Sequence, residues 1–299
     1  MTKRTAYLRY FAGLLMFGSN GVAASLIHLS SSEIVLLRSA LGSALLIVLF
    51  FALGGRCTAL RHKKSLLFLA VSGSAMAANW LFLFQAYRQI GVSLATLITY
   101  CGPVIVMALS PLLFRERVTA VKLAALLAAL IGVFLISGQA AMEGVRLRGI
   151  LCAGLSAASY VVLVVFSKLS GEISGMENST VQLFFTFLTV AVFVGIRGGF
   201  SMRISSGDWL PILWIGLLNT GIACWLYFSA IGALPVQTVA VCGYLEPLSA
   251  VLFSVLLLGE RLRGVQMLGA VLIVGGAVAG ELLGDTPPKP RNSLRCAQH

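Results

Sequence analysis

The sequence predicts an all-α integral membrane protein of ten transmembrane helices, arranged as two inverted repeats of five helices. Three observations support this prediction: an apolar composition, ten apolar segments of spanning length, and a duplicated residue pattern. The mean hydropathy is +0.96, 59% of the residues are hydrophobic and 11% are charged. Soluble domains carry about 25% charged residues. The composition therefore fits a bilayer rather than water as the solvent.

A spanning helix needs about 20 mostly apolar residues, and the chain offers ten such segments joined by short connections. The first follows Lys3, Arg4 and Arg9 as a signal peptide would, but it is long and nine more follow, so it is expected to be an uncleaved helix. Residues 285–299 are Pro-rich and polar and are expected to form a disordered cytoplasmic tail. The expected spans are 7–28, 33–53, 65–88, 93–114, 120–138, 147–168, 177–197, 208–231, 236–258 and 264–284.

The duplicated pattern recurs at a constant distance of 144 positions. The residues Tyr100, Pro103, Glu116 and Arg117 return as Tyr244, Pro247, Glu260 and Arg261. Ten spans divide into five for a first repeat at 1–143 and five for a second at 144–284. Because five is odd, the second repeat must enter the membrane from the opposite side. Inverted repeats are a common construction of secondary transporters, with the substrate near the midplane.

The net charge of +12 is explained by loops rather than by nucleic acid. Lys and Arg accumulate in cytoplasmic loops of membrane proteins. With the N-terminus inside, 14 of the 22 basic residues fall in inside segments and 7 in outside segments. Both termini are therefore predicted to be cytoplasmic.

No enzyme-like constellation stands out. The six cysteines show no pairing pattern, and the three histidines have no metal-ligand spacing. Hydrolase, zinc-protease and nucleotide-binding motifs are missing from suitable contexts. We expect no catalysis, no cofactor, no metal and no nucleic-acid partner. A membrane enzyme acting on lipid-linked substrates and a gated channel are the alternatives from other classes.

The stretch from Ala86 to Arg117 and its partner Leu245–Arg263 resemble the EamA-type drug/metabolite transporters. The Glu246-Pro247 pair, the run from Phe17 to Asn20, and Arg38 also fit that family's pattern. The similarity extends to the YddG-like aromatic amino-acid exporters. It implies an exporter in a bacterial inner membrane with aromatic or neutral amino acids as favoured substrates. The protein is separately expected to function as a monomer. Nucleosides, amines or drugs are the alternative cargo.

Two prolines and two charged residues are candidates for moving or coupling parts. Pro103 and Pro247 sit at equivalent mid-span positions, where a proline kinks a helix and frees a carbonyl. Glu246 is the one carboxylate near a span centre, and either proton coupling, capture of a substrate ammonium or a capping role is open. Arg38 is expected mainly to snorkel to the interface. An interhelix clamp or a partner for a substrate carboxylate is the alternative.

A central cavity is expected between spans one, three, four, six, eight and nine. Intramembrane amides, including Gln85 and Asn219, prefer a partner over lipid and are expected to face the interior. Polar, small and aromatic residues share stripes at helical spacing on several spans. Hydrogen bonding between helices without substrate contact is the alternative interpretation. The predicted cavity residues are Asn20, Asn79, Tyr100, Tyr160 and Tyr244.

Overall fold

The computed structural model describes residues 2–114, 118–137, 147–173, 175–197, 202–258 and 264–282. Within these ranges every regular element is a helix, so the all-α prediction is confirmed for them. Six helices there are long and apolar enough to cross a membrane, and three shorter apolar helices accompany them. The repeated pairs Glu116-Arg117 and Glu260-Arg261 lie outside the described residues.

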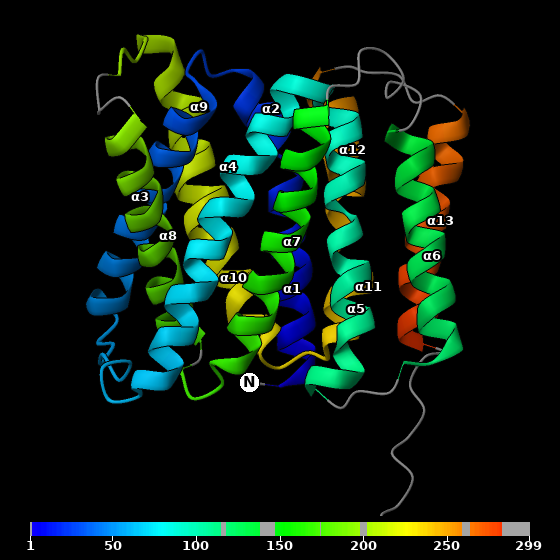
Figure 1. Ribbon diagram of the computed structural model, residues 1–299, viewed down its shortest axis with the longest axis horizontal. Helices are drawn as coiled ribbons and strands as arrows, with labels where there is room; N and C mark the ends of the chain where they lie inside the picture. The colour runs from blue at the N-terminus through cyan, green and yellow to red at the C-terminus, as the bar shows by residue number, and fades with distance from the viewer. Residues whose placement is uncertain are drawn as a thin grey trace, which may run out of the picture.

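The helices stand side by side in one bundle (Figure 1). Those of the first half are α1 Lys3–Gly18, α2 Asn20–Ser25, α3 Ser31–Ala52, α4 Lys63–Thr99, α5 Cys101–Phe114 and α6 Ala120–Ser137. Those of the second half are α7 Leu147–Leu169, α8 Gly175–Arg197, η2 Ser206–Asp208, α9 Trp209–Leu213, η3 Trp214–Ile222, α10 Ala223–Ile231, α11 Val236–Cys242, α12 Leu245–Leu258 and α13 Gly264–Leu282.

The helix boundaries differ from the predicted ones at three places. Helix α4 continues through the predicted connection at 89–92, which contains one Gly and no Pro, so its backbone can keep helical hydrogen bonds. Residues 214–222 of the predicted span 208–231 form a π-helix. The predicted spans 93–114 and 236–258 are each interrupted, at Tyr100 and at Gly243–Tyr244 respectively.

The helix packing follows the 144-residue offset. Helix α1 packs along α10 and α12, and its equivalent α7 packs along α4 and α5. Helix α3 packs against η3, and its equivalent α8 packs against α4. The pairs α3–α8 and α6–α13 join equivalent segments to each other. Each of these helix pairs thus has a counterpart in the other half or is its own counterpart.

At the α6–α13 crossing, individual close contacts also recur at the 144-residue offset. A methyl group on Gly132 would lie 2.6 Å from the carbonyl oxygen of Gly269, and one on Gly276 would lie 2.7 Å from that of Ala125. Gly276 and Gly269 are 144 positions after Gly132 and Ala125. Small residues let membrane helices approach this closely. The two crossings are therefore equivalent contacts at equivalent positions.

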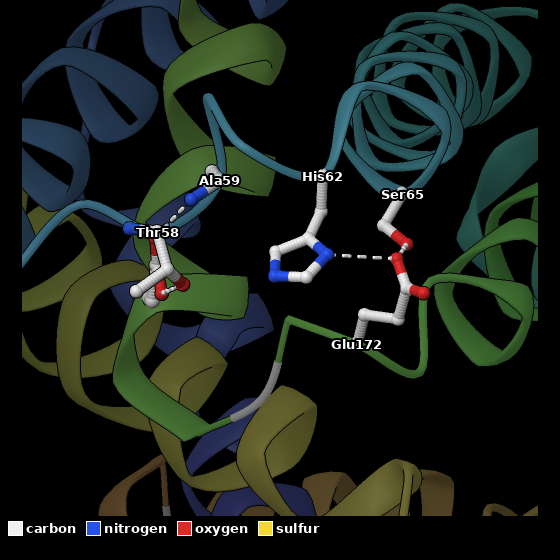
Figure 2. Close-up of polar contacts among 6 residues, drawn as sticks. Thr58, Ala59, His62, Ser65 and Glu172 are labelled. Atoms are coloured by element: carbon white, nitrogen blue, oxygen red, sulfur yellow. Dashed lines mark hydrogen bonds and ion pairs between the residues drawn. The ribbon is translucent and has the colours of Figure 1, made fainter.

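One end of the bundle is fastened by two carboxylates (Figure 2). Glu177, at the start of α8, accepts hydrogen bonds from the backbone N–H of Thr58 at 2.5 Å and of Ala59 at 2.6 Å. Glu172 accepts a hydrogen bond from the Ser65 hydroxyl at 2.9 Å and lies 3.1 Å from His62 Nδ1. These contacts hold the α3–α4 connection against the α7–α8 connection. The start of α1 and the end of α13 lie at the same end (Figure 1).

The opposite end has a related contact. His28, between α2 and α3, lies 2.9 Å from the carboxylate of Asp208 in η2. The position of His28 corresponds to that of Glu172 by the 144-residue offset. In each half, the connection between the first two spans therefore contacts the start of the other half's third span. The first half supplies a histidine from this connection, and the second half supplies a carboxylate from the equivalent position.

Candidate functional site

A polar cluster occupies the contact between the first, second, third and eighth predicted spans. We call it the Arg38 cluster; its members are Ser19, Asn20, Arg38, Trp80, Asn219 and Thr220. Four separate chain segments supply these side chains, so the cluster exists only in the folded bundle. Trp80 and Asn20 are half-buried, whereas the other four members are buried.

Arg38 is at the centre of the cluster. Its Nε donates to the Thr220 hydroxyl at 2.9 Å, and its Nη2 donates to the Asn20 amide oxygen at 3.4 Å. The guanidinium carbon lies 4.1 Å from the centroid of the Trp80 ring, a cation–π distance. The side chain is 3% exposed. The expectation that it snorkels to the interface was wrong, because three partners hold it inside the bundle.

The turn at Ser19 and the π-helix η3 position the polar side chains of this cluster. Helix α1 ends at Gly18, and a turn at Ser19 separates it from α2. The Ser19 hydroxyl and the Asn20 amide oxygen accept hydrogen bonds from the Asn219 amide at 2.8 and 3.1 Å. Asn219 and Thr220 lie on the π-helix η3, where Thr220 donates to the carbonyl of Ile215 five residues earlier at 2.7 Å. π-Helical segments occur frequently at functional sites.

Helix α12 places a carboxylate beside this cluster. Gly18 of α1 is so close to α12 that a methyl group there would overlap Ser249, and the Ser249 hydroxyl donates to the carbonyl of Leu14 at 3.1 Å. Glu246 lies one turn before Ser249 and is half-buried. Its carboxylate interacts electrostatically with the Arg38 guanidinium. No hydrogen bond to this carboxylate occurs within the part of the chain that the structure describes.

Glu246 and its repeat equivalent Gly102 have different surroundings. A methyl group on Gly102 would lie 2.9 Å from the Tyr160 ring, so no larger side chain fits there without displacing that ring. The residue equivalent to Tyr160 in the first half is Met16. The space beside Gly102 is thus occupied by an aromatic ring from the second half, whereas the equivalent residue of the second half, Glu246, carries a carboxylate.

Two of the predicted cavity tyrosines, Tyr100 and Tyr244, contact each other where the helices are interrupted. The Tyr100 and Tyr244 rings are 5.6 Å apart, and the Tyr244 hydroxyl donates to the Tyr100 carbonyl at 2.6 Å. Tyr244 is fully buried and Tyr100 is half-buried. The hydroxyl of Tyr160 lies 3.5 Å from that of Tyr227, a residue that the sequence interpretation missed. Because Tyr100 and Tyr244 are repeat equivalents, their contact joins the two halves at equivalent points.

Asn79 and the two prolines take positions that reinforce helix contacts. The Asn79 amide donates to the Ser156 carbonyl and hydroxyl, both at 2.9 Å, joining α4 to α7. Pro103 and Pro247 are each the third residue of a new helix, α5 or α12. A proline in a first turn removes an N–H that has no intrahelical partner. The chain therefore breaks just before each proline rather than bending around it.

Sequence reasoning missed part of the cluster. Gln85, expected inside, is exposed. Thr220 was not singled out, although Asn219-Thr220 is an adjacent polar pair in an apolar segment. Trp80 lies within a predicted span, but nothing in its spacing indicated contact with Arg38, which lies 42 positions away in the chain.

The chain resembles known transporters over most of its length. The sequence profile of the EamA-like transporter family matches residues 4–138 and again 147–279. The uncharacterized transporter YxxF of Bacillus subtilis is 26% identical over 92% of this chain and 88% of its own length. The threonine/homoserine exporter RhtA of Salmonella typhimurium is 27% identical over 82% of this chain and 80% of its own length. A crystal structure of a protein 23% identical superposes with a TM-score of 0.79, covering 93% of this chain and 98% of the other.

Proposed function

Because this chain is a member of the EamA-like transporter family, we propose that it is a secondary transporter that exports small metabolites by alternating access. The observation that carries the proposal is the contact between the interrupted helices at Tyr100 and Tyr244. Unwound segments at matching positions in two repeats are where transporters of this construction bind substrate.

The packing supports an inverted repeat. The equivalent helices α1 and α7 have equivalent neighbours, as do α3 and α8, and the family profile matches the chain twice. The start of α1 lies at the same end of the bundle as the α7–α8 connection (Figure 1). Helix α7 therefore runs toward the end from which α1 leaves. When two such halves exchange conformations, an inward-open carrier becomes outward-open.

The predicted site residues divide into two roles in this proposal. Asn20, Tyr100 and Tyr160 are half-buried and line the substrate path. Asn79 and Tyr244 are buried in helix contacts and hold that path in shape. The breaks before Pro103 and Pro247 are the hinges, since an interrupted backbone changes its angle without breaking regular hydrogen bonds.

Aromatic or other neutral amino acids are the favoured substrates. The similarity to a threonine/homoserine exporter supports amino-acid cargo, and half-buried aromatic rings with a polar handle suit flat substrates. Export of a nucleoside, amine or drug is the second candidate, favoured by Glu246, a half-buried carboxylate that suits a cationic group.

We place the protein as a monomer in a bacterial inner membrane with both termini in the cytoplasm. The excess of basic residues in the predicted inside segments supports this orientation. Alkaline phosphatase and fluorescent-protein fusions at residue 299 test it. A phosphatase-active, non-fluorescent fusion would reverse the orientation.

Transport in proteoliposomes tests the function. The purified protein is reconstituted and loaded with labelled L-phenylalanine, L-threonine, uridine or phenethylamine in parallel. Efflux of the two amino acids above protein-free vesicles is expected. Efflux of uridine or the amine alone would favour the second candidate, and flux of every solute without saturation would indicate a channel instead.

A further inference from the structure

We propose that Arg38 binds the carboxylate group of the transported solute and thereby selects carboxylated substrates. This inference rests on the proposed transport function and assigns a substrate group to one side chain. The arginine is 3% exposed, and it forms no ion pair among the described residues. Arginine is rarely buried unless an anion compensates its charge.

The partners that Arg38 has are all neutral. Thr220 accepts from Nε, Asn20 accepts from Nη2, and Trp80 covers one face of the guanidinium. Nη1 contacts no acceptor in the part of the chain that the structure describes. A planar guanidinium recognises a carboxylate through two parallel N–H groups. The neutral partners fix the plane of the guanidinium. The anion that would compensate its charge is left to be supplied by the ligand.

Glu246 does not provide that anion directly. Its carboxylate and the guanidinium form neither a salt bridge nor a hydrogen bond with each other. An α-amino acid carries its ammonium two bonds from its carboxylate carbon. A zwitterion whose carboxylate is bound by Arg38 therefore brings an ammonium group into the cluster, and Glu246 in the first turn of α12 is the carboxylate available to pair with it.

The repeat shows that the bundle itself does not need this arginine. The position equivalent to Arg38 is Gln182, which is fully buried at the matching α4–α8 crossing. The positions equivalent to Asn219 and Thr220 are Ala75 and Met76. The same helix crossing is thus built without a charge in the other half. The polar cluster is consequently a local addition, which supports a role in binding.

Trp80 provides a direct optical test of this site. The chain has four tryptophans, and replacing Trp209, Trp214 and Trp225 by Phe leaves Trp80 as the single emitter. The purified variant is titrated with L-phenylalanine, benzoate, L-phenylalaninamide, phenethylamine and inorganic phosphate. L-Phenylalanine and benzoate are expected to change Trp80 emission saturably. The amide and the amine, which lack a carboxylate, are expected to bind on the order of tenfold more weakly or not at all.

Arg38→Gln in this background is expected to remove the preference for the carboxylate over the amide. Arg38→Lys is expected to retain part of it, because the charge remains but the bidentate fork is lost. The matched control is Arg9→Gln. In the unsubstituted chain Arg9 stacks on Trp225 at 5.2 Å and donates to a hydroxyl at 3.4 Å, but it is only half-buried. The Trp225→Phe substitution of this background keeps an aromatic ring under Arg9. Its substitution is expected to leave the preference unchanged.

The outcomes separate this inference from the transport proposal. Unchanged carboxylate preference in Arg38→Gln, or equal binding of acid and amide by the unsubstituted site, overturns the inference even if amino acids are exported. A response to phosphate alone assigns the site to a phosphate or a lipid headgroup and also overturns it. Carboxylate binding that depends on Arg38, without amino-acid efflux, supports the site and overturns the amino-acid cargo. If Arg38→Gln does not fold, the acid–amide comparison and Arg38→Lys still decide.

Discussion

The α3–η3 crossing and the α8–α4 crossing pack equivalent helices but differ in the charge and polarity of the side chains between them. Each packs the second span of one half against the third span of the other half. The first has Arg38, Asn219 and Thr220 where the second has Gln182, Ala75 and Met76. The backbone fold therefore tolerates both sets of side chains. What the fold requires is the close approach of the helices, and what differs between the crossings is available for function.

The two crossings keep their close approach by the same device. A methyl group on Gly42 would lie 2.7 Å from Thr220, and one on Gly73 would come too close to the Gln182 carbonyl. Both contacts depend on glycine, whereas the buried charge occurs in the first crossing alone. Gln182 contributes little to the second crossing through its amide, since neither amide atom has a hydrogen-bond partner among the described residues. Two crossings with the same packing thus differ in a few side chains, which place a buried charge in one of them.

The largest expected effect tests the equivalence of the two halves on which this comparison depends. Gly132→Ala and Gly276→Ala each place a methyl group against a backbone carbonyl of the facing helix, at 2.6 and 2.7 Å. Each is expected to lower the free energy of unfolding by about 3 kcal/mol, the upper end for overpacking, because the methyl group meets backbone rather than a flexible side chain. Unfolding in mixed detergent micelles measures this. The neighbouring Gly275→Ala is the control, because nothing lies within 4 Å of that methyl group. Clearly unequal effects of the first two substitutions would contradict the equivalence.

The second prediction tests how much the buried charge of Arg38 in the α3–η3 crossing depends on its hydroxyl acceptor. Thr220→Val keeps the shape of the side chain but removes the acceptor for Arg38 Nε and the bond to Ile215. Because a buried charged donor loses its partner, the free energy of unfolding should fall by about 1.5–3 kcal/mol. The same substitution at Thr186, in the second crossing, loses only bonds to the carbonyls of Gly73 and Gln182 and should cost about 0.5–1.5 kcal/mol. Equal losses in the micelle unfolding assay would mean that Arg38 finds another partner.

The sequence predicted the features that depend on composition and on repetition. Apolar length indicated the helices, and the offset of 144 indicated which segments correspond, so Tyr100 and Tyr244 were both selected before their contact was known. The breaks near Pro103 and Pro247 were expected as kinks. Their position before each proline follows from the missing N–H, which costs least in a first turn.

The sequence did not predict the features that depend on which helices meet. Arg38 was expected to snorkel because its depth in the span is evident from the sequence, whereas its contacts with Thr220 and Trp80 depend on tertiary packing. The π-helix η3 carries no Pro that would mark it, and Gly216 and Gly221 within it do not distinguish it from a regular helix. Asn79 was correctly placed inside the bundle, but only the structure shows that Ser156 is its partner.

The third prediction compares two equivalent carboxylates at opposite ends of the bundle. Glu177 accepts three hydrogen bonds from Thr58 and Ala59 across the α3–α4 connection, whereas Glu33 caps its own helix through Ser30. Glu177→Ala should lower the free energy of unfolding by about 1.5–3 kcal/mol, and Glu33→Ala by about 0.5–2 kcal/mol. Limited proteolysis of the α3–α4 connection provides a second measurement. Faster cleavage is expected for Glu177→Ala only, and equal cleavage in both variants would contradict a role for Glu177 in holding this connection.

The smallest expected effect concerns the two tyrosines that join the halves. The Tyr244 hydroxyl donates to the Tyr100 carbonyl at 2.6 Å, while the equivalent bond from Tyr100 to Tyr244 is not formed. Tyr244→Phe removes a neutral hydrogen bond in the interior and should lower the free energy of unfolding by about 0.5–1.5 kcal/mol. Tyr100→Phe loses a hydroxyl on a half-buried ring and should change stability less.

Transport should show the reverse order for this pair. If Tyr100 lines the substrate path and Tyr244 shapes it, Tyr100→Phe raises the solute concentration that gives half-maximal efflux. It leaves the melting temperature nearly unchanged. Tyr244→Phe lowers the melting temperature with a smaller change in half-saturation. Both values come from one reconstituted preparation, so the ratio of the two effects is independent of expression. A stability loss in Tyr100→Phe as large as that in Tyr244→Phe, or larger, would show that the asymmetry seen at this contact does not govern the energetics.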